Sequence, residues 1–548
     1  MLKRMKNQDG FATLIALIMM GMLMLIGVAA ISLTDDEVTV AGNELQEMRA
    51  FYAAEAGLEA AAAALNQEYD STGVPPTILP SGSDSINLCS VNYTTIDGGA
   101  ATKRVLTVGS LAGLHALVKS FTLQSTAVST FDKAKVQLSQ EFETALVPIF
   151  QFAVFYGNDL EIAPGADMSL IGRVHSNGNL WIQAGATLKM DSYVTASGEI
   201  LHGRKGPGGV SNGDVLIKDA DGNYVSMKAG GSWVDHNLSA WYDSSVSRWD
   251  GRVQDAAHGQ TELSLPLTNA GDPHKMIERA TGNPDSYETK ADLRILDGQV
   301  YRYMEDNTWQ NVTAGMIADG VLTYTNNKFW DDREDKWVDC TELDVEAMYD
   351  NGYAPRNGVM YFSDSVSGGT DWPALRLKNG AELDDGLAVI SENPMYTLGD
   401  FNSVDKKPAS LMADAVTFLS NAWQSGNYDT KSTQSKSNRT ASNTTVNASY
   451  LTGNIETTAS NYNGGFENLP RFLEKWSGKN FNWSGSAVNL WNSEQANGNW
   501  DGAYYDPPNR NWTYDTDLDD PNKLPPETPV VRVFQRTGWK QDYVSFDY

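Results

Sequence analysis

The feature that most restricts the fold of this chain is a run of 23 residues without a charged side chain, from Phe11 to Leu33. A helix rises about 1.5 Å per residue, so this run can cross a hydrocarbon core of about 30 Å. Because basic residues favour the cytoplasmic side of a membrane, we expect residues 1–10 inside the cell and the remainder outside. The flanking charges are Lys3, Arg4 and Lys6 before the run, and Asp35, Asp36 and Glu37 after it.

Two other interpretations of this segment are a secretory signal peptide and a plain single-pass anchor. A signal peptide has an apolar region of about 7–15 residues that ends at a small-residue cleavage site. The run here is longer, and a helical pattern continues straight through it. One detail favours a third interpretation. The basic leader ends at Gly10 and Phe11 opens the apolar run, which allows cleavage between them.

The helical pattern continues beyond the apolar run, and Ala60–Ala64 has the best intrinsic helix propensity. We therefore predict one helix of about 55 residues that ends near Leu65, with an amphipathic second half packed on another element. Gly and Pro residues between 67 and 82 are typical of a loop. The apolar residues that recur at helical spacing are Val38, Ala41, Leu45, Met48, Tyr52 and Leu65.

The composition excludes one class of partner. The chain has 548 residues and a net charge of −28, so it lacks the basic face that a nucleic-acid-binding protein needs. Hydrophobic residues make up 41% of the chain, which is ordinary for a globular protein. The length allows about three domains.

An internal repeat lies between residues 159 and 198, where Asp159–Gly178 aligns without gaps on Asn179–Gly198. Short alternating strands separated by turns, at this period of 20 residues, predict coils of a parallel β-solenoid. Two consecutive β-hairpins are the alternative. Two coils cannot bury a core alone, and the same texture of strands and turns returns after Gly358. The identities are Leu160/Leu180, Ile162/Ile182, Gly165/Gly185, Ala166/Ala186, Val174/Val194 and Gly178/Gly198.

Three N-terminal features carry a resemblance to a known family: the leader that ends at Gly10–Phe11, the long apolar helix, and the stretches Ala41-Gly42-Asn43 and Phe51–Gly57. They resemble the N-terminal region of PilX-type minor pilins of type IV pili. In that family a prepilin peptidase cuts after the glycine and N-methylates the next residue, here Phe11. The resemblance also implies that the apolar helix packs into a filament core, through positions such as Phe11, Leu14, Ile15, Leu17 and Ile18.

The fifth position after the cleavage point departs from most major pilins, which carry Glu where this chain has Ile15. PilX-type minor pilins and the K-type pseudopilins commonly lack this Glu too. In the family it is thought to pair with the N-terminal amine of a neighbouring subunit. Its absence fits a subunit at a tip or in an initiation complex. Later stretches, such as residues 154–162 and 393–402, resemble large pilus-assembly proteins with PilX-type N-termini.

The expected fold class is α+β, with a long membrane-spanning helix, a pilin-like β domain and a large, mostly-β head that includes parallel β-solenoid coils. The expected divisions are a prepilin leader, a transmembrane or filament-core helix, a pilin-like helix plus sheet, the start of the solenoid, an insertion, further solenoid coils, and an aromatic, loop-rich C-terminal region. Their residue ranges are, in order, 1–10, 11–33, 34–130, 131–204, 205–355, 356–460 and 461–548.

Acidic clusters are the first candidates for a chemical site. Asp515, Asp517 and Asp519 alternate like the start of a calcium loop, but the sixth and twelfth places hold Asp520 and Pro526 instead of Gly and Glu. We therefore expect a solvated acidic loop and no cofactor, with calcium as the alternative. The run at 331–335 is likewise expected to be a solvated face that calcium would screen.

Other candidate residues also favour a structural reading. His175 lies next to a turn and is expected to be a hydrogen-bonded corner residue rather than part of a Ser/His dyad. No motif singles out a pair of carboxylates for glycoside hydrolysis, so we expect no enzyme. Cys89 and Cys340 are the only cysteines, and an oxidising compartment permits a disulfide between them, with free thiols as the alternative.

The expected function is that of a minor pilin-like component of a type IV pilus, which initiates assembly or caps the tip and displays a large extracellular head for adhesion. The alternatives are a pseudopilin of a type II secretion-like system and a membrane-anchored β-helix protein that binds or acts on polysaccharide. The expected partners are other pilins and minor pilins, the prepilin peptidase, and a surface or glycan receptor, with no nucleic acid. We expect a single-pass protein of the inner membrane that then joins the cell-surface pilus.

Overall fold

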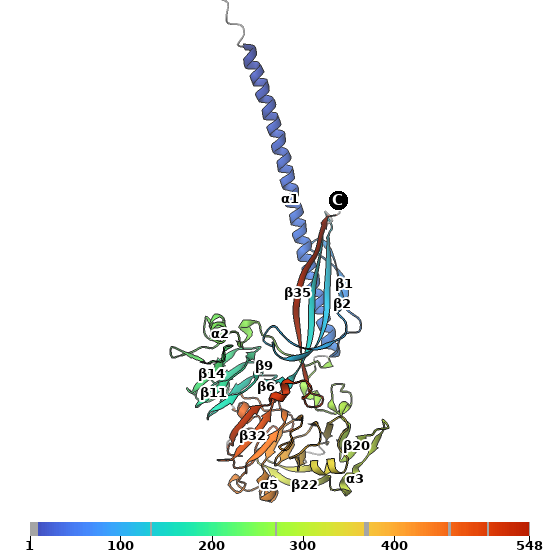
Figure 1. Ribbon diagram of the computed structural model, residues 1–548, viewed down its shortest axis with the longest axis vertical. Coiled ribbons are helices and arrows are strands. Elements are labelled where there is room, and N and C mark those ends of the chain that lie inside the picture. The colour runs from blue at the N-terminus through green and yellow to red at the C-terminus, as the bar shows by residue number, and fades with distance from the viewer. Residues whose placement is uncertain are drawn as a thin grey trace, which may run out of the picture.

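The longest element is the helix α1, Asp9–Thr72, which continues past the predicted end near Leu65. Its 64 residues correspond to about 96 Å of helix. Figure 1 shows its first half standing clear of the rest of the protein. The computed structural model describes residues 9–131, 134–268, 271–365, 372–458, 462–500 and 504–546, so the basic leader residues lie outside the described part.

The second half of α1 packs on an antiparallel sheet of six strands, in the order β1-β2-β4-β5-β35 with β3 beside β4. This sheet uses both ends of the chain, because its last strand is formed by residues near the C-terminus. The strands are β1 Ser81–Ile86, β2 Cys89–Asp97, β3 Thr102–Val105, β4 His115–Ser129, β5 Ala134–Pro148 and β35 Val530–Phe546.

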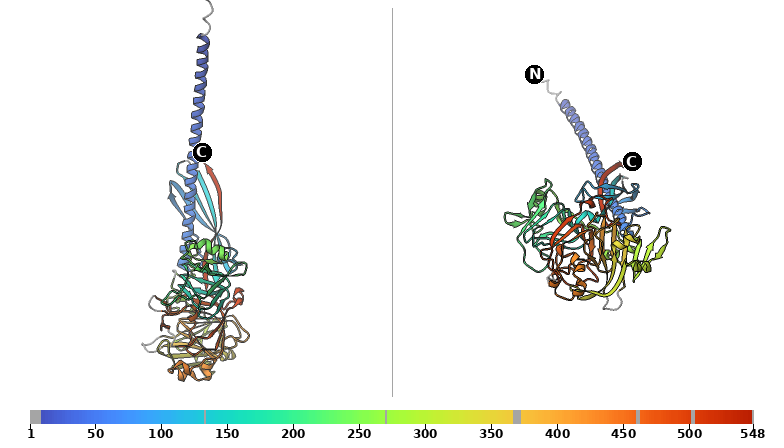
Figure 2. Two further views of the ribbon diagram at one scale, coloured as in Figure 1. Left: turned by 90° about the vertical axis from the view of Figure 1, so that its left-hand side faces the viewer. Right: turned by 60° about the horizontal axis from the view of Figure 1, so that its bottom comes forward.

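The head is inserted between two neighbouring strands of this sheet. Strand β5 ends at Pro148, and its pairing partner β35 begins at Val530, directly opposite. Residues 149–529 therefore leave the sheet at the end of β5 and return at the same end of the sheet, where β35 begins. The predicted pilin-like region, 34–130, leaves out β5 and β35, and the predicted loop-rich region, 461–548, includes the 17-residue strand β35. Figure 2 shows the head below the sheet, on the side away from the exposed half of α1.

The 20-residue repeat pairs with itself in parallel. Leu180 lies opposite Leu160 on one side and Ile200 on the other, which excludes two consecutive hairpins. Each repeat adds one strand to each of three sheets. The strands are β6 Phe152–Tyr156, β9 Arg173–Ser176 and β12 Val194–Ala196; β7 Leu160–Ile162, β10 Leu180–Ile182 and β13 Ile200–His202; and β8 Met168–Leu170, β11 Thr187–Met190 and β14 Asp214–Lys218.

A second series of parallel strands lies on the other side of β6. The series is β24 Val359–Ser363, β26 Leu387–Ser391, β28 Ala409–Ala413, β31 Ser449–Thr452 and β33 Ala487–Asn489. Its last strand, β33, pairs in parallel with β6. The chain therefore enters this sheet in the middle, runs outward along a first arm, crosses to the far end, and returns along a second arm to the strand beside its entry.

The predicted insertion, 205–355, contributes strands to both arms. Strand β14 and β18, Val253–Gln254, extend the first arm. Strand β19, Leu293–Leu296, pairs in parallel with β24 at the far end of the second arm. This region is therefore part of the head sheets, because it supplies the outermost strands of the first arm and of the second arm. The sheets are mixed, since β19 also pairs antiparallel with β20, Gln299–Tyr303.

The observed fold class is α+β: one long apolar helix and a large β-rich body. Leu160, Ile162, Leu180 and Ile182 all belong to one buried cluster, as predicted, and that cluster is shared by both arms. The remaining elements are β15 Tyr224–Ser226, β16 Lys228–Ala229, β17 Ser232–Trp233, β21 Trp309–Asn311, β22 Leu322–Asp331, β23 Lys336–Asp344, β25 Pro373–Lys378, β27 Met395–Leu398, β29 Val416–Leu419, β30 Thr444–Asn447, β32 Asn480–Gly485, β34 Asn509–Tyr514, α2 Trp241–Trp249, α3 Thr313–Ala318, α4 Val345–Asp350, α5 Asn421–Ser425, and the short 3-10 helices η1 Ile149–Gln151, η2 Ala256–His258, η4 Pro273–Met276, η5 Tyr287–Lys290, η6 Tyr428–Lys431, η7 Lys436–Asn438, η8 Phe466–Asn468 and η9 Thr516–Asp519.

Candidate functional site: the exposed helix and the head surface

The apolar half of α1 has no covering element among the described residues. This helix is long and apolar enough to cross a membrane by length and composition, and the apolar stretch is not buried inside the protein. Gly10 and Phe11, the predicted processing pair, lie in its first turns. The predicted filament-core residues Phe11, Leu14, Ile15, Leu17 and Ile18 are all exposed, from 43% at Ile15 to 70% at Leu17.

The exposed apolar surface continues down α1 as a stripe of Val38, Leu45, Met48 and Tyr52. The amphipathic pattern predicted that these residues would pack together with Leu65 on another element. Only Leu65 is buried against the sheet. The physical reason is helical geometry, since 13 residues separate Tyr52 from Leu65, which places their side chains on opposite faces at about 3.6 residues per turn.

Small residues form the face of α1 that does pack on the sheet. A Cβ at Gly57 would clash with the Ser125 side chain and lie 2.7 Å from Val91 Cγ1. Glycine at this position therefore lets the helix approach β2 and β4 closely. The other buried residues on this face are Ala50, Ala53, Ala54, Leu58, Ala61, Ala62, Leu65 and Tyr69.

Two arginines of strand β35 form ion pairs with the second half of α1. Arg536 donates to both carboxylate oxygens of Glu59, at 2.5 and 2.6 Å, and Arg532 pairs with Asp70. The hydrogen bond from Arg536 lowers the pKa of Glu59. The C-terminal strand thus links the helix to the point where the head begins.

The disulfide that an oxidising compartment would permit between Cys89 and Cys340 is not formed, and both cysteines are free thiols, which was the alternative. Cys89 lies in the core between α1 and the first sheet, whereas Cys340 lies in a hydrophobic cluster of the head. Burial raises the pKa of both thiols, to about 12 for Cys340. These side chains contribute packing in two separate cores.

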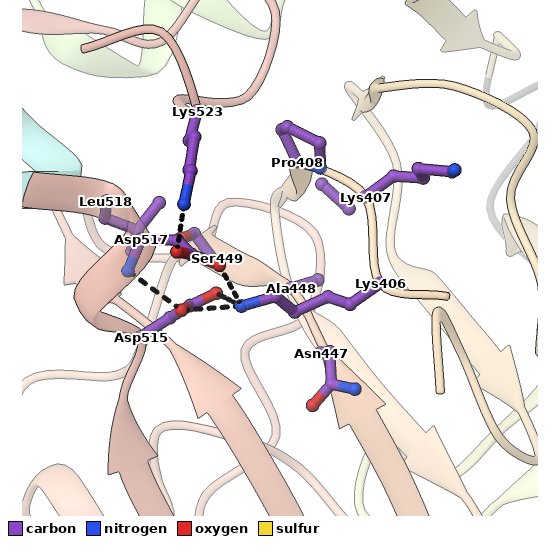
Figure 3. A pocket seen from close by; sticks show the side chains of 11 residues that line it. Lys406, Lys407, Pro408, Asn447, Ala448, Ser449, Asp515, Asp517, Leu518 and Lys523 are labelled. Carbon is purple, nitrogen blue, oxygen red and sulfur yellow. Dashed lines mark hydrogen bonds and ion pairs between the residues drawn. The ribbon is translucent and has the colours of Figure 1, made fainter. Parts of the chain in front are cut away.

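Lysines pair with two of the three aspartates that resembled a calcium loop, Asp515 and Asp517 (Figure 3). Lys406 lies 2.7 Å from both carboxylate oxygens of Asp515 and 2.8 Å from Asp517. Lys523 lies 2.7 Å from Asp517. Hydrogen bonds from these two lysines lower the pKa of Asp517 to about 2. The third member, Asp519, instead accepts a hydrogen bond from Tyr514, so the three carboxylates do not share one cation.

The acidic run at 331–335 is not a solvated face, because Asp331, Arg333 and Glu334 are buried. The Asp331 carboxylate accepts the Tyr396 hydroxyl at 2.7 Å, and Glu334 pairs with Arg471 at 2.5 Å. These partners come from the second arm, far along the chain. Burial raises the pKa of the Asp331 carboxyl.

His175 is buried and hydrogen-bonded, as predicted, but it lies within strand β9 rather than at a corner. Its Nδ1 lies 2.8 Å from Thr195 Oγ1 and its Nε2 lies 2.9 Å from Asn177 Oδ1. Burial lowers the pKa of this imidazole to about 4. The neutral ring therefore links two successive repeats.

Sequence reasoning missed two buried glutamates from distant segments, Glu161 and Glu467. The Glu467 carboxylate accepts the Ala163 N–H at 2.8 Å, and Glu161 accepts the Lys205 N–H at 2.9 Å. Burial raises the pKa of Glu467 to about 7, with a further contribution from the charge of Glu161. Each carboxylate accepts a hydrogen bond from a backbone N–H of another segment. The two glutamates therefore stabilise the fold of the head.

An uncharged polar face covers the outer side of β30, β32 and β34. Asn509 and Asn511 donate to Asn480 and Asn482, each at 3.0 Å, and Asn482 donates to Thr445 at 3.2 Å. The alternate residues, including Phe481, Trp483 and Trp512, point into the core. This amide ladder carries no charged side chain although the protein is strongly acidic. Its members are Thr445, Asn447, Asn480, Asn482, Ser484, Asn509, Asn511 and Thr513.

The fold and these surfaces define a class of protein with one long, exposed apolar N-terminal helix joined to a large β-rich body. No protein-family model matches the sequence, and no curated protein matches it either. Among solved structures, the chain is similar to the crystal structure of the competence-associated pilin ComZ from Thermus thermophilus. The sequence identity is 12% and the TM-score is 0.33, over 92% of this chain and 98% of that chain.

Proposed function

We propose that this chain is a minor pilin-like subunit of a type IV pilus, which initiates assembly or caps the tip and displays a large head. One observation carries this proposal. The helix α1 is exposed along its apolar half and packed by a small-residue face along its second half, and the head leaves the sheet at the opposite end. The exposed half would lie in the inner membrane before assembly and among the helices of other pilins afterwards.

Ile15 supports placement at a tip or in an initiation complex. An acidic side chain at this position would neutralise the N-terminal amine of a neighbouring subunit inside an apolar bundle. An unpaired buried amine is costly, so a subunit without this carboxylate would be disfavoured beneath another subunit. A head of this size would also be difficult to repeat at every position along a shaft.

The proposal includes a β-solenoid organisation for the head. Its support is the parallel, in-register stacking of strands 20 residues apart and the apolar cluster that the stacked repeats share. A head of this kind projects sheet faces away from the filament. Its role in this proposal is structural and adhesive, without catalysis.

Processing at Gly10 tests the pilin assignment. Mature protein should begin at N-methylated Phe11, and Gly10→Leu should abolish the cut, leaving the leader on the chain. Mass spectrometry of the N-terminal peptide from purified membranes measures both outcomes. Gly21→Leu is the matched control, because this glycine lies on the same exposed helix with no neighbouring atom within 4 Å. A peptide that starts at Phe11 in the Gly10→Leu protein would refute the assignment.

The uncharged amide ladder favours a neutral glycan as the ligand of the head. Amide and hydroxyl groups form hydrogen bonds with sugar hydroxyls, and a face without charge does not repel or select ionic groups. Asn482 and Asn511 lie at its centre, and Asn511 is exposed.

Charge substitutions on the ladder test this second candidate. The pair Asn482→Asp and Asn511→Asp should reduce binding of the full-length protein to a neutral polysaccharide by about tenfold, through two lost donors and two desolvated charges. Affinity electrophoresis against neutral and anionic polysaccharides measures the effect. Asn311→Asp, on the exposed strand β21, should leave binding unchanged. If the double variant and the Asn311→Asp control lose equal amounts of polysaccharide binding, the glycan binds outside the amide ladder.

A further inference from the structure

A histidine and three carboxylates from distant segments meet where the crossover segment, residues 255–292 between β18 and β19, contacts the second arm. His274, in η4, is 3% exposed and is surrounded by Glu278, Asp414 and Glu494. Neither Asp414 nor Glu494 lies within a hundred residues of the crossover segment in sequence, so the head fold alone brings the group together. No pattern in the sequence indicated it.

Asp414 fixes the orientation of the His274 ring. This carboxylate is fully buried just after β28, and it accepts backbone N–H groups from Glu494 at 2.6 Å and Ala496 at 2.8 Å. It also lies 3.4 Å from His274 Nε2. A carboxylate held in this way on one imidazole nitrogen is the usual support for a histidine whose other nitrogen binds a metal.

The other ring nitrogen, Nδ1, faces two glutamates. It lies 3.0 Å from Glu278 Oε1 and 3.8 Å from Glu494 Oε1. One ligand atom from each of the three residues lies within 4.8 Å of the other two. Ligand atoms about 2.0–2.2 Å from a tetrahedral Zn²⁺ are about 3.3–3.6 Å apart. The Nδ1–Glu278 distance is slightly shorter than this spacing and the Nδ1–Glu494 distance slightly longer.

We propose that His274, Glu278 and Glu494 form a binding site for a divalent transition metal of the Zn²⁺ type, with Asp414 as the residue that positions the histidine. Nitrogen and carboxylate oxygen are ordinary Zn²⁺ ligands, and three protein ligands leave a fourth position for water. Bound metal would join the crossover segment to the segment after β33, and so hold the crossover segment against the second arm.

Direct binding to the full-length protein in detergent tests the site. After treatment with a chelator, the protein should bind one equivalent of Zn²⁺ by isothermal titration calorimetry. Glu494→Gln should weaken binding at least tenfold, and Glu278→Gln should do the same. Glu494 is 61% exposed, so its substitution should leave the fold intact. The matched control is Glu456→Gln, a similarly exposed glutamate paired with Lys205, which should bind Zn²⁺ like the parent.

Two further measurements distinguish a metal site from a cluster of ion pairs. Co²⁺ bound in place of Zn²⁺ should give the visible absorption of a four-coordinate ion, and this signal should disappear in Glu494→Gln. Lys275 lies 2.6 Å from Glu278 and competes for its carboxylate, so Lys275→Gln should tighten binding. Lack of stoichiometric binding, or binding that neither glutamate substitution weakens, would show that these groups form ion pairs only and would overturn the proposal.

Discussion

Leu180→Asp should unfold the head. Leu180 is completely buried in the middle strand β10, between Leu160 and Ile200. The substitution removes a large apolar side chain from the core, at a cost of about 2–5 kcal/mol, and adds the cost of an unpaired carboxylate among apolar neighbours. Together these losses are comparable with the total stability of a typical domain, about 5–15 kcal/mol. The loss of protease resistance and of cooperative thermal unfolding measures this effect in the purified full-length protein.

Ser169→Asp is the matched control for this prediction. Ser169 is an exposed residue of β8 in the neighbouring repeat, and it lies opposite Lys189. The same charge is therefore added to a solvated position beside a lysine, and the change in stability should stay below about 0.5 kcal/mol. A Leu180→Asp protein that unfolds like the parent would contradict the shared core of the repeats.

Gly57→Leu should detach α1 from the first sheet. The new side chain has no space beside Ser125 and Val91, and both neighbours belong to strands that are paired on each side. Overpacking of this kind costs about 1–3 kcal/mol or more, which exceeds the gain of about 1 kcal/mol from replacing glycine in a helix. Urea unfolding of the full-length protein in detergent measures the change in free energy.

Gly42→Ala is the control, because a Cβ at Gly42 has no neighbouring atom within 4 Å. This substitution should stabilise the protein by about 0.5–1 kcal/mol, which is opposite in sign to the effect at Gly57. A Gly57→Ala protein should be destabilised, and adding Ser125→Gly should restore part of the loss, because the Ser125 side chain is the nearest obstacle. Equal behaviour of the two glycine positions would refute close packing as the role of Gly57.

Features that depend on nearby residues were predictable. The apolar run from Phe11 to Leu33 defines the exposed helix, since a helix of uncharged residues needs no partner elsewhere in the chain to be recognised. The repeat at 159–198 also predicted which residues of neighbouring strands lie opposite each other. When similar units stack, residues that are 20 apart in the sequence become pairing partners. The hydrogen-bonded role of His175 was also expected from the turn that follows it, although the residue itself lies in strand β9.

Features that depend on distant contacts were missed or predicted incorrectly. The acidic run at 331–335 is buried because Tyr396 and Arg471 approach it from the second arm. Asp515 and Asp517 are paired with Lys406, which lies over a hundred residues earlier. The two cysteines lie in separate cores, so their presence in one chain gave no information about their distance.

The sequence by itself determined a long helix with an uncharged half, a β-rich body, and parallel stacking of one repeat, because each depends on the period of side chains close together in the chain. Only the tertiary structure decided that β33 returns beside β6, that β35 closes the first sheet next to β5, and that His274 meets Asp414 and Glu494. The physical reason is that strand pairing satisfies backbone groups, which every residue carries. The choice of a distant partner strand therefore depends on the packing of the whole head rather than on a local signal.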